Sequence, residues 1–160
     1  HFIENNELSI NDEHISAYLR TNTDGLRVDM GTFWSSTIAT LIVPRYLNEY
    51  SLRVQDAQAG FQATSSDSRG FWMANRVSSS ETRNRHNSTL ITQSRTSVGL
   101  SQVPFYIGAS RGNASNPSLK AFYSNRETAF NTIGEGLTDT ESSNLYTRIQ
   151  AFQTSLSRNV

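Results

Sequence analysis

The chain of 160 residues contains no cysteine and only one lysine, Lys120. The absence of cysteine excludes disulfide bonds, thiol catalysis and zinc–thiolate sites. Charged residues are also scarce at 18%, and 14 basic side chains balance 14 acidic ones. A net charge of zero gives no electrostatic reason to expect nucleic acid or an anionic membrane as a partner. No apolar run approaches the roughly 20 residues of a membrane span, so we expect no membrane insertion.

Uncharged polar residues take the place of the missing charges. Hydrophobic residues make up 36% of the chain, enough for one packed core, and Ser, Thr, Asn and Gln supply most of the remaining surface. This composition favours exposed strands and turns over surface helices. Thirteen of the basic residues are arginine, whose planar fork suits fixed hydrogen-bonding positions, such as carboxylate pairs between strands. Asp29 lies two residues after Arg27, and Glu127 follows Arg126 directly. Each carboxylate is interpreted as forming a salt pair with the arginine near it in sequence.

Most of the chain is predicted to form short strands separated by polar turns. Polar loops are expected at 65–68, 78–87 and 111–118, and Pro44 is expected to end a strand. Many short strands at this spacing are typical of a sandwich or a barrel. The predicted strands are 15–21, 26–31, 38–43, 50–55, 60–64, 70–77, 89–93, 103–109, 120–123 and 127–133.

The C-terminal segment predicts one amphipathic helix over about 139–157. Thr138 and Glu141 have the spacing of a capping box, in which each side chain satisfies a free backbone N–H of the other. Apolar residues then recur on one face of the helix, and we expect this stripe to pack on the sandwich. The fold class is therefore all-β with one C-terminal helix. The stripe consists of Leu145, Ile149, Phe152 and Leu156.

Few residues carry a pattern that predicts catalysis or metal binding. The three histidines, His1, His14 and His86, lack metal-ligand spacing, and His86 is expected in a solvated hairpin tip. No nucleophile elbow or phosphate-binding loop occurs. No strand carries the alternating carboxylates that would indicate a glycosidase.

Calcium is the one cofactor for which the predicted turns contain suitable ligands. Asp24, Asp56 and Asp67 are each expected in a turn and offer the oxygen ligands that calcium prefers. Aspartates in turns also accept hydrogen bonds from their own backbone, which is the competing interpretation.

Aromatic residues beside planar polar groups suggest a sugar-binding surface. Neighbouring residues of a strand face opposite sides, so either Phe71 or Trp72 is expected on an open face. An exposed ring stacks on the apolar face of a sugar, while polar groups bind its hydroxyls. Packing in the core is the competing interpretation for each ring. The predicted glycan-binding residues are Trp34, Asp67, Arg69, Trp72, Asn75 and Arg76.

Several segments resemble a known family. The sequence YSNRETAFNTIGEGLTDTE at 123–141 is the most specific of them, and it is extended by the helical segment 145–158. HISAYLRT at 14–21, SRGF at 68–71 and FYIGA at 105–109 agree with it. Together they resemble concanavalin-like (laminin-G-like) jelly-roll domains at the C-termini of bacteriophage structural proteins, such as tail fibres, and of bacterial surface proteins.

The resemblance implies a single lectin-like jelly-roll domain over 1–160, on a virion or cell surface. Because the chain begins with His1 and not Met, we expect a processed product or the C-terminal part of a longer polypeptide. Members of the family begin with more β-strand before the segment at 14–21, so the resemblance implies that the chain lacks the first strands of the domain. We expect a non-catalytic attachment module that recognises host or environmental polysaccharide and forms a homo-oligomer. A structural module that makes assembly contacts only and a polysaccharide-degrading enzyme are the two alternatives.

Overall fold

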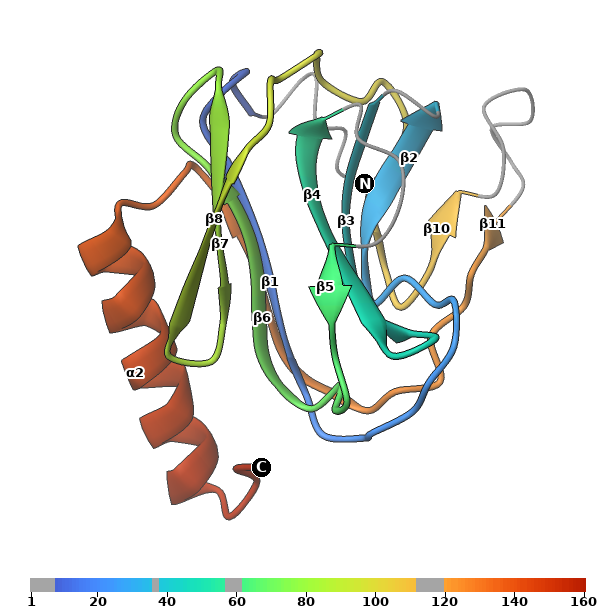
Figure 1. Ribbon diagram of the computed structural model, residues 1–160. Helices are drawn as coiled ribbons and strands as arrows, with labels where there is room; N and C mark the ends of the chain where they lie inside the picture. Colours follow the sequence, from blue (N-terminus) through green and yellow to red (C-terminus); the bar gives the residue numbers. More distant parts are fainter. Residues whose placement is uncertain (1–7, 36–37, 57–61, 112–119) are drawn as a thin grey trace.

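The computed structural model describes residues 8–35, 38–56, 62–111 and 120–160. This part of the chain is mostly β-structure, with two five-stranded antiparallel sheets, a two-stranded ribbon and one helix near the C-terminus (Figure 1). The ribbon pairs β10 (Ser110–Arg111) with β11 (Lys120–Ala121). The all-β prediction with a C-terminal helix is therefore confirmed at this level.

The first sheet has the strand order β12-β1-β6-β7-β8. Its central strand β6 pairs with β1 so that Trp72 lies opposite Ala17, and β1 pairs with β12 so that Tyr18 lies opposite Phe130. The strands are β1 (Glu13–Leu19), β6 (Gly70–Arg76), β7 (Glu81–His86), β8 (Thr89–Ser94) and β12 (Thr128–Gly134).

The second sheet has the order β5-β4-β3-β2-β9, and its two edge strands are only two residues long. The hairpin of β3 and β4 forms its centre, with Ile42 opposite Leu52. The strands are β2 (Met30–Ser35), β3 (Ile38–Tyr46), β4 (Glu49–Asp56), β5 (Ala63–Thr64) and β9 (Tyr106–Ile107).

The main hydrophobic core lies between the two sheets, which makes the arrangement a sandwich. Alternate residues of each strand point inward. The first sheet contributes Ile15, Ala17, Leu19, Trp72 and Ala74, and the second contributes Met30, Ile42, Tyr50, Leu52 and Val54. Eight of these ten side chains are completely buried, and none is more than 7% exposed.

The helix α2 (Asp139–Ser155) covers the outer face of the first sheet (Figure 1). Its capping box is confirmed: the Thr138 hydroxyl accepts the N–H of Glu141, and the Glu141 carboxylate accepts the N–H of Thr138. Ile149 packs on a second cluster made by Tyr18, Phe71 and Met73. Further along the predicted stripe, Phe152 is 48% exposed and Leu156 42% exposed, so only part of the stripe is covered by described residues.

The largest error of the sequence prediction is β7, which replaces the polar loop expected at 78–87. This strand lacks an apolar alternation because its inward residues are polar. Thr82 and Asn84 are completely buried, and Asn84 accepts the N–H of Asn75 through its side-chain oxygen. Hydrogen bonds here replace the apolar contacts that mark a strand in sequence. The expected hairpin tip is shifted to Asn87 and Ser88, which form a turn between β7 and β8.

Other strand boundaries differ from the prediction for local reasons. Pro44 does not end β3, which continues to Tyr46 through a register shift between Val43 and Tyr46, and a proline is tolerated at such an irregularity because no ladder N–H is needed there. The strand expected at 26–31 begins only at Met30, and the one at 103–109 shortens to Tyr106–Ile107. Most of the loop expected at 111–118 lies outside the described residues.

The capping box makes the first testable prediction. Thr138→Ala removes the hydroxyl that accepts the Glu141 N–H, and it should cost about 1 kcal/mol of unfolding free energy, or ~2–4 °C in the thermal midpoint. Thr140→Ala is the matched control, because Thr140 is exposed in the first turn of the same helix. Thermal unfolding followed by circular dichroism measures both. Equal midpoints for the two variants would contradict the capping role.

Candidate functional site

Trp72, expected on an open face, is a core residue. It is completely buried, its indole N–H donates to the Ser68 carbonyl at 2.9 Å, and its ring stacks on His86 with centroids 3.7 Å apart. The prediction assumed that one face of the sheet is open. That assumption is wrong, because Trp72 faces the second sheet while its neighbour Phe71 is covered by α2.

Asn75 and Arg76 are also buried, at 1% and 0% exposure. Arg76 donates through Nε to the Val54 carbonyl and through Nη1 to the carbonyls of Ser78 and Arg95, so it joins strands rather than offering a binding group. Asn75 exchanges two hydrogen bonds with the backbone of Leu137 and anchors the approach to α2. The side chain of Trp34 lies outside the described part of the structure. The six predicted residues therefore do not form one surface.

Of the five predicted residues whose side chains the structure describes, Asp67 and Arg69 reach the surface. Arg69 binds both carboxylate oxygens of Asp67, with Nη2 at 2.7 Å from Oδ2 and Nε at 3.1 Å from Oδ1. The side chains are 38% and 46% exposed. Hydrogen bonding from Arg69 is the main reason that the pKa of the Asp67 carboxyl lies below its usual value. Asp67 is therefore ionised at neutral pH.

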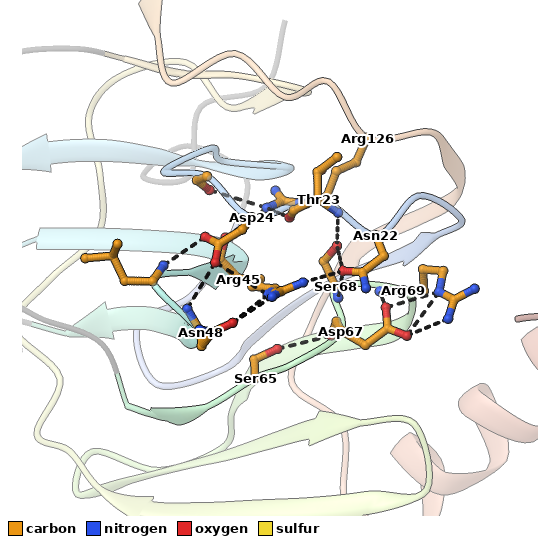
Figure 2. Close-up of polar contacts among 12 residues, drawn as sticks. Asn22, Thr23, Asp24, Arg45, Asn48, Ser65, Asp67, Ser68, Arg69 and Arg126 are labelled. Carbon is orange, nitrogen blue, oxygen red and sulfur yellow. Dashed lines mark hydrogen bonds and ion pairs between the residues drawn. The ribbon is translucent and has the colours of Figure 1, made fainter.

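This pair belongs to a larger polar surface where three loops meet at one end of the sandwich (Figures 1 and 2). The loops are the segment after β1, the turn between β3 and β4, and the segment between β5 and β6. We call this surface the loop-end cluster. It consists of Asn22, Asp24, Arg45, Asn48, Asp67, Ser68 and Arg69.

Asp24 fixes the turn between β3 and β4. Its carboxylate accepts the N–H of Leu47 at 2.8 Å and of Asn48 at 3.2 Å. Both residues have positive φ, 52° and 61°, a conformation that costs a leucine roughly 1–2 kcal/mol. The aspartate acceptor offsets part of this cost, and the turn holds Leu47 with 70% of its surface exposed.

Arg45 and Asn22 connect the loops to each other. The Arg45 guanidinium donates to the Asn48 side-chain oxygen at 2.6 Å and to the Asn22 side-chain oxygen at 3.0 Å. The same Asn22 oxygen accepts the N–H of Ser68 at 3.1 Å, and the Ser68 hydroxyl accepts the N–H of Thr23 at 3.0 Å. Asn22, Asp24, Arg45, Asn48 and Ser68 are therefore linked by hydrogen bonds, and the Asp67–Arg69 pair lies beside them, as Figure 2 shows.

Beneath the cluster lies a buried ion pair between Arg126 and Asp29, with Nη1 at 2.8 Å from Oδ2 and both side chains at 0% exposure. The guanidinium also donates to the carbonyls of Thr23 at 2.8 Å, Arg45 at 2.9 Å and Gly25 at 3.3 Å. Burial raises the pKa of the Asp29 carboxyl, and the Arg126 charge opposes that rise. One side chain thus holds two of the three loops against the body of the sandwich.

His86 is not the solvated loop histidine that the sequence predicted. It lies on β7, stacked on Trp72, with its Nε2 atom 3.5 Å from the Arg69 carbonyl. Burial lowers its pKa, although this carbonyl and the Asp67 charge act in the opposite direction. The ring is therefore neutral at neutral pH, and it adds no cation to the cluster.

The three aspartates considered as calcium ligands are not brought together. Asp24 binds backbone N–H groups, Asp67 binds Arg69, and Asp56 lies at the other end of β4, where it pairs with Arg53 at 3.0 Å. Within residues 8–35, 38–56, 62–111 and 120–160 no group of three or more His, Asp or Glu is placed to hold a metal ion. The loop-end cluster presents planar hydrogen-bonding groups. The negative charges of Asp24 and Asp67 balance the positive charges of Arg45 and Arg69.

Comparisons with protein-family models, with curated proteins and with solved structures each give no match to this chain. In the described part of the chain, the one long helix is too polar and too short to cross a membrane. The chemistry of the loop-end cluster is therefore the main guide to function.

Sequence reasoning missed Arg126, Arg45, Asp24 and Asn22 as parts of one site. Arg126 and Glu127 were interpreted as a salt pair because they are neighbours, but Glu127 pairs with Arg20 and Arg126 with Asp29. Both residues precede β12, and their adjacency in the chain did not indicate their partners. No local pattern in the sequence predicts that loops far apart in the chain lie next to each other in the fold.

The buried ion pair gives a second prediction. Arg126→Met leaves Asp29 as an uncompensated buried charge and frees three carbonyls, so it should cost about 3–5 kcal/mol of unfolding free energy. Arg20→Met is the matched control: its pair with Glu127 is partly exposed, and losing such a pair costs about 0–1 kcal/mol. Denaturant unfolding measures both. Similar losses would show that the Arg126 pair does not organise this end of the sandwich.

A third prediction concerns the pH dependence of stability. Because the pKa of His86 is lower in the folded state, the unfolded chain binds more protons below about pH 6.5, and stability falls as the pH drops through that value. His86→Phe keeps a ring against Trp72 and removes the titration. The unfolding free energy of this variant should decline less than that of the parent between about pH 7.5 and 5.5. Parallel declines would contradict a neutral, half-buried His86.

Proposed function

We propose that this domain is a non-catalytic attachment module that binds a neutral, hydroxyl-rich glycan on the loop-end cluster. The observation that carries the proposal is the exposed Asp67–Arg69 pair beside Arg45 and Asn48, where carboxylate, guanidinium and amide groups are hydrogen-bonded to one another at the surface. Sugar hydroxyls both donate and accept hydrogen bonds, so neighbouring hydroxyls are matched by planar groups with paired donors or paired acceptors.

The balance of charge argues for a neutral sugar. Asp24 and Asp67 offset Arg45 and Arg69, and the buried Asp29 offsets Arg126. An acidic polysaccharide would be bound better by a surface with excess positive charge. Neutral hydroxyls need no excess of positive charge on the protein. They are therefore the groups that a surface with balanced charges binds best.

The apolar part of the surface differs from the tryptophan platform expected from the sequence. Leu47 is 70% exposed at the tip of the turn that Asp24 holds. Its side chain offers an aliphatic contact for the C–H face of a sugar ring, next to the polar groups of Asn48 and Arg45. We expect weak binding to a single sugar, since an aliphatic contact buries less area than an aromatic ring.

Two carboxylates, Asp67 in the loop-end cluster and Asp29 beneath it, favour binding over hydrolysis. A glycosidase needs one carboxylic acid with a raised pKa to protonate the leaving oxygen. The pKa of Asp67 is instead lowered by Arg69. Asp29, whose pKa is raised, is completely buried beneath the loops and has no exposed surface for a substrate.

The architecture agrees with the wider role implied by the family resemblance. Two antiparallel sheets whose connecting loops meet at one end give a sandwich a surface there for binding a ligand. The proposed setting is the surface of a virion or of a cell, where several copies of the chain form a homo-oligomer and bind host or environmental polysaccharide. Fold alone does not select a ligand, so the proposal depends on the cluster.

A structural module that makes assembly contacts is the second candidate, and a different surface favours it. Ile107 on β9 is 64% exposed and Tyr123 is 56% exposed. Their segments are joined where the Ser124 N–H donates to the Gly108 carbonyl at 2.8 Å. Large exposed apolar side chains on adjoining segments mark contacts with another protein chain.

A glycan array followed by titration calorimetry tests the proposal. The folded domain should bind a neutral glycan, and Arg69→Gln should weaken that binding by about tenfold, equivalent to ~1.4 kcal/mol, because the guanidinium fork is lost. Arg83→Gln is the matched control, since Arg83 pairs with Glu81 on β7, outside the cluster. It should leave the affinity unchanged.

Two results would reject the proposal. If a folded sample does not bind at millimolar glycan, the structural module with an assembly surface at Ile107 and Tyr123 would be favoured instead. Glycan binding that is weakened equally by both variants would place the ligand somewhere other than the loop-end cluster.

A further inference from the structure

A shallow groove of about 230 Å³ lies between α2 and β12, on the outer face of the first sheet. It is separate from the loop-end cluster, because it is built by the helix and an edge strand rather than by the loops. Four apolar side chains and one basic side chain form its walls. These residues are Phe130, Leu145, Arg148, Ile149 and Phe152.

The apolar walls are preformed rather than collapsed. Phe130 on β12 and Phe152 on α2 meet edge to face with centroids 6.2 Å apart, and Ile149 is anchored at 3% exposure in the cluster below the helix. Phe152 nevertheless remains 48% exposed. Covering apolar surface is worth roughly 25 cal/mol per Å², so an occupant that covers this ring would gain binding energy from the contact.

Arg148 is the one charged residue among the described residues that line the groove, and no acidic side chain lies beside it there. Arg20, Arg69 and Arg83 each pair with a carboxylate. Among the described residues Arg148 has neither a carboxylate partner nor a hydrogen bond from its guanidinium. A guanidinium at the edge of an apolar groove binds a carboxylate through two parallel hydrogen bonds more strongly than it binds water.

We propose that this groove binds a small amphiphilic carboxylate, with an apolar chain against Phe130, Leu145 and Phe152 and the carboxylate on Arg148. The volume sets the size of the ligand, because pockets for drug-sized molecules occupy about 300–1,000 Å³ and this groove is smaller. A medium-chain acid of about eight carbons has both the apolar length and the single negative charge that the walls require.

The test titrates the purified chain with octanoate, octanol and acetate, and follows binding by calorimetry and by NMR shifts of the α2 amides. Octanoate should bind at least about tenfold more tightly than octanol, which lacks the charge, and than acetate, which lacks the chain. Arg148→Gln should remove that preference and leave octanol binding unchanged. Arg158→Gln is the matched control, because Arg158 is an exposed arginine beyond the end of α2 and outside the groove.

Three outcomes would overturn the proposal. Equal affinities for octanoate and octanol would show that Arg148 selects no anion. Absence of octanoate binding at about 10 mM would show that the groove takes no such ligand. A concentration-dependent dimer in sedimentation that is lost in Phe152→Ser, with helix content unchanged, would assign the groove to a second copy of the chain. The glycan proposal does not depend on any of these results.

Discussion

The ion pair of Arg126 with Asp29 is the interaction on which this end of the sandwich depends. Both side chains are completely buried, and removing charge from water is expensive unless every polar atom finds a partner. The guanidinium meets that requirement by donating to Asp29 and to three loop carbonyls, and Asp29 also accepts the Ser124 hydroxyl. These hydrogen bonds offset the cost of burying the two charges, and they fix loops that contain few apolar residues of their own. The position of the loop-end cluster above therefore depends on this pair.

The same solution recurs elsewhere in a chain that is poor in lysine and rich in arginine. Arg76 joins both sheets through the Val54 carbonyl, and Arg85 reaches α2 through the Ser142 hydroxyl at 3.1 Å. A planar fork with five donors connects several backbone carbonyls at once, which the compact ammonium of lysine does not do. Polar interiors built in this way allow a domain with only 36% hydrophobic residues to hold two sheets and a helix together.

The sequence predicted those parts of the fold whose signals are local. The helix followed from the capping box and the apolar stripe, and β1, β4 and β6 followed from their apolar residues. It did not predict β7, whose buried Thr82 and Asn84 are satisfied by hydrogen bonds. Nor did it predict that both Phe71 and Trp72 are buried, because α2 covers Phe71 on the face of the sheet that was expected to be open. Of the candidate site only Asp67 and Arg69 were found, since the rest of the cluster comes from loops that meet only in three dimensions.

Amide hydrogen exchange in Arg126→Lys tests the central claim most directly, namely that one buried guanidinium holds the loops as a single surface. Lysine keeps the charge opposite Asp29 but cannot bond three carbonyls together. The account predicts at least about tenfold faster exchange at the amides of Leu47, Asn48 and Ser68, which bond within the cluster, and unchanged protection in β6 and α2. Unchanged protection of the loop amides, or a uniform loss across the whole domain, would contradict it.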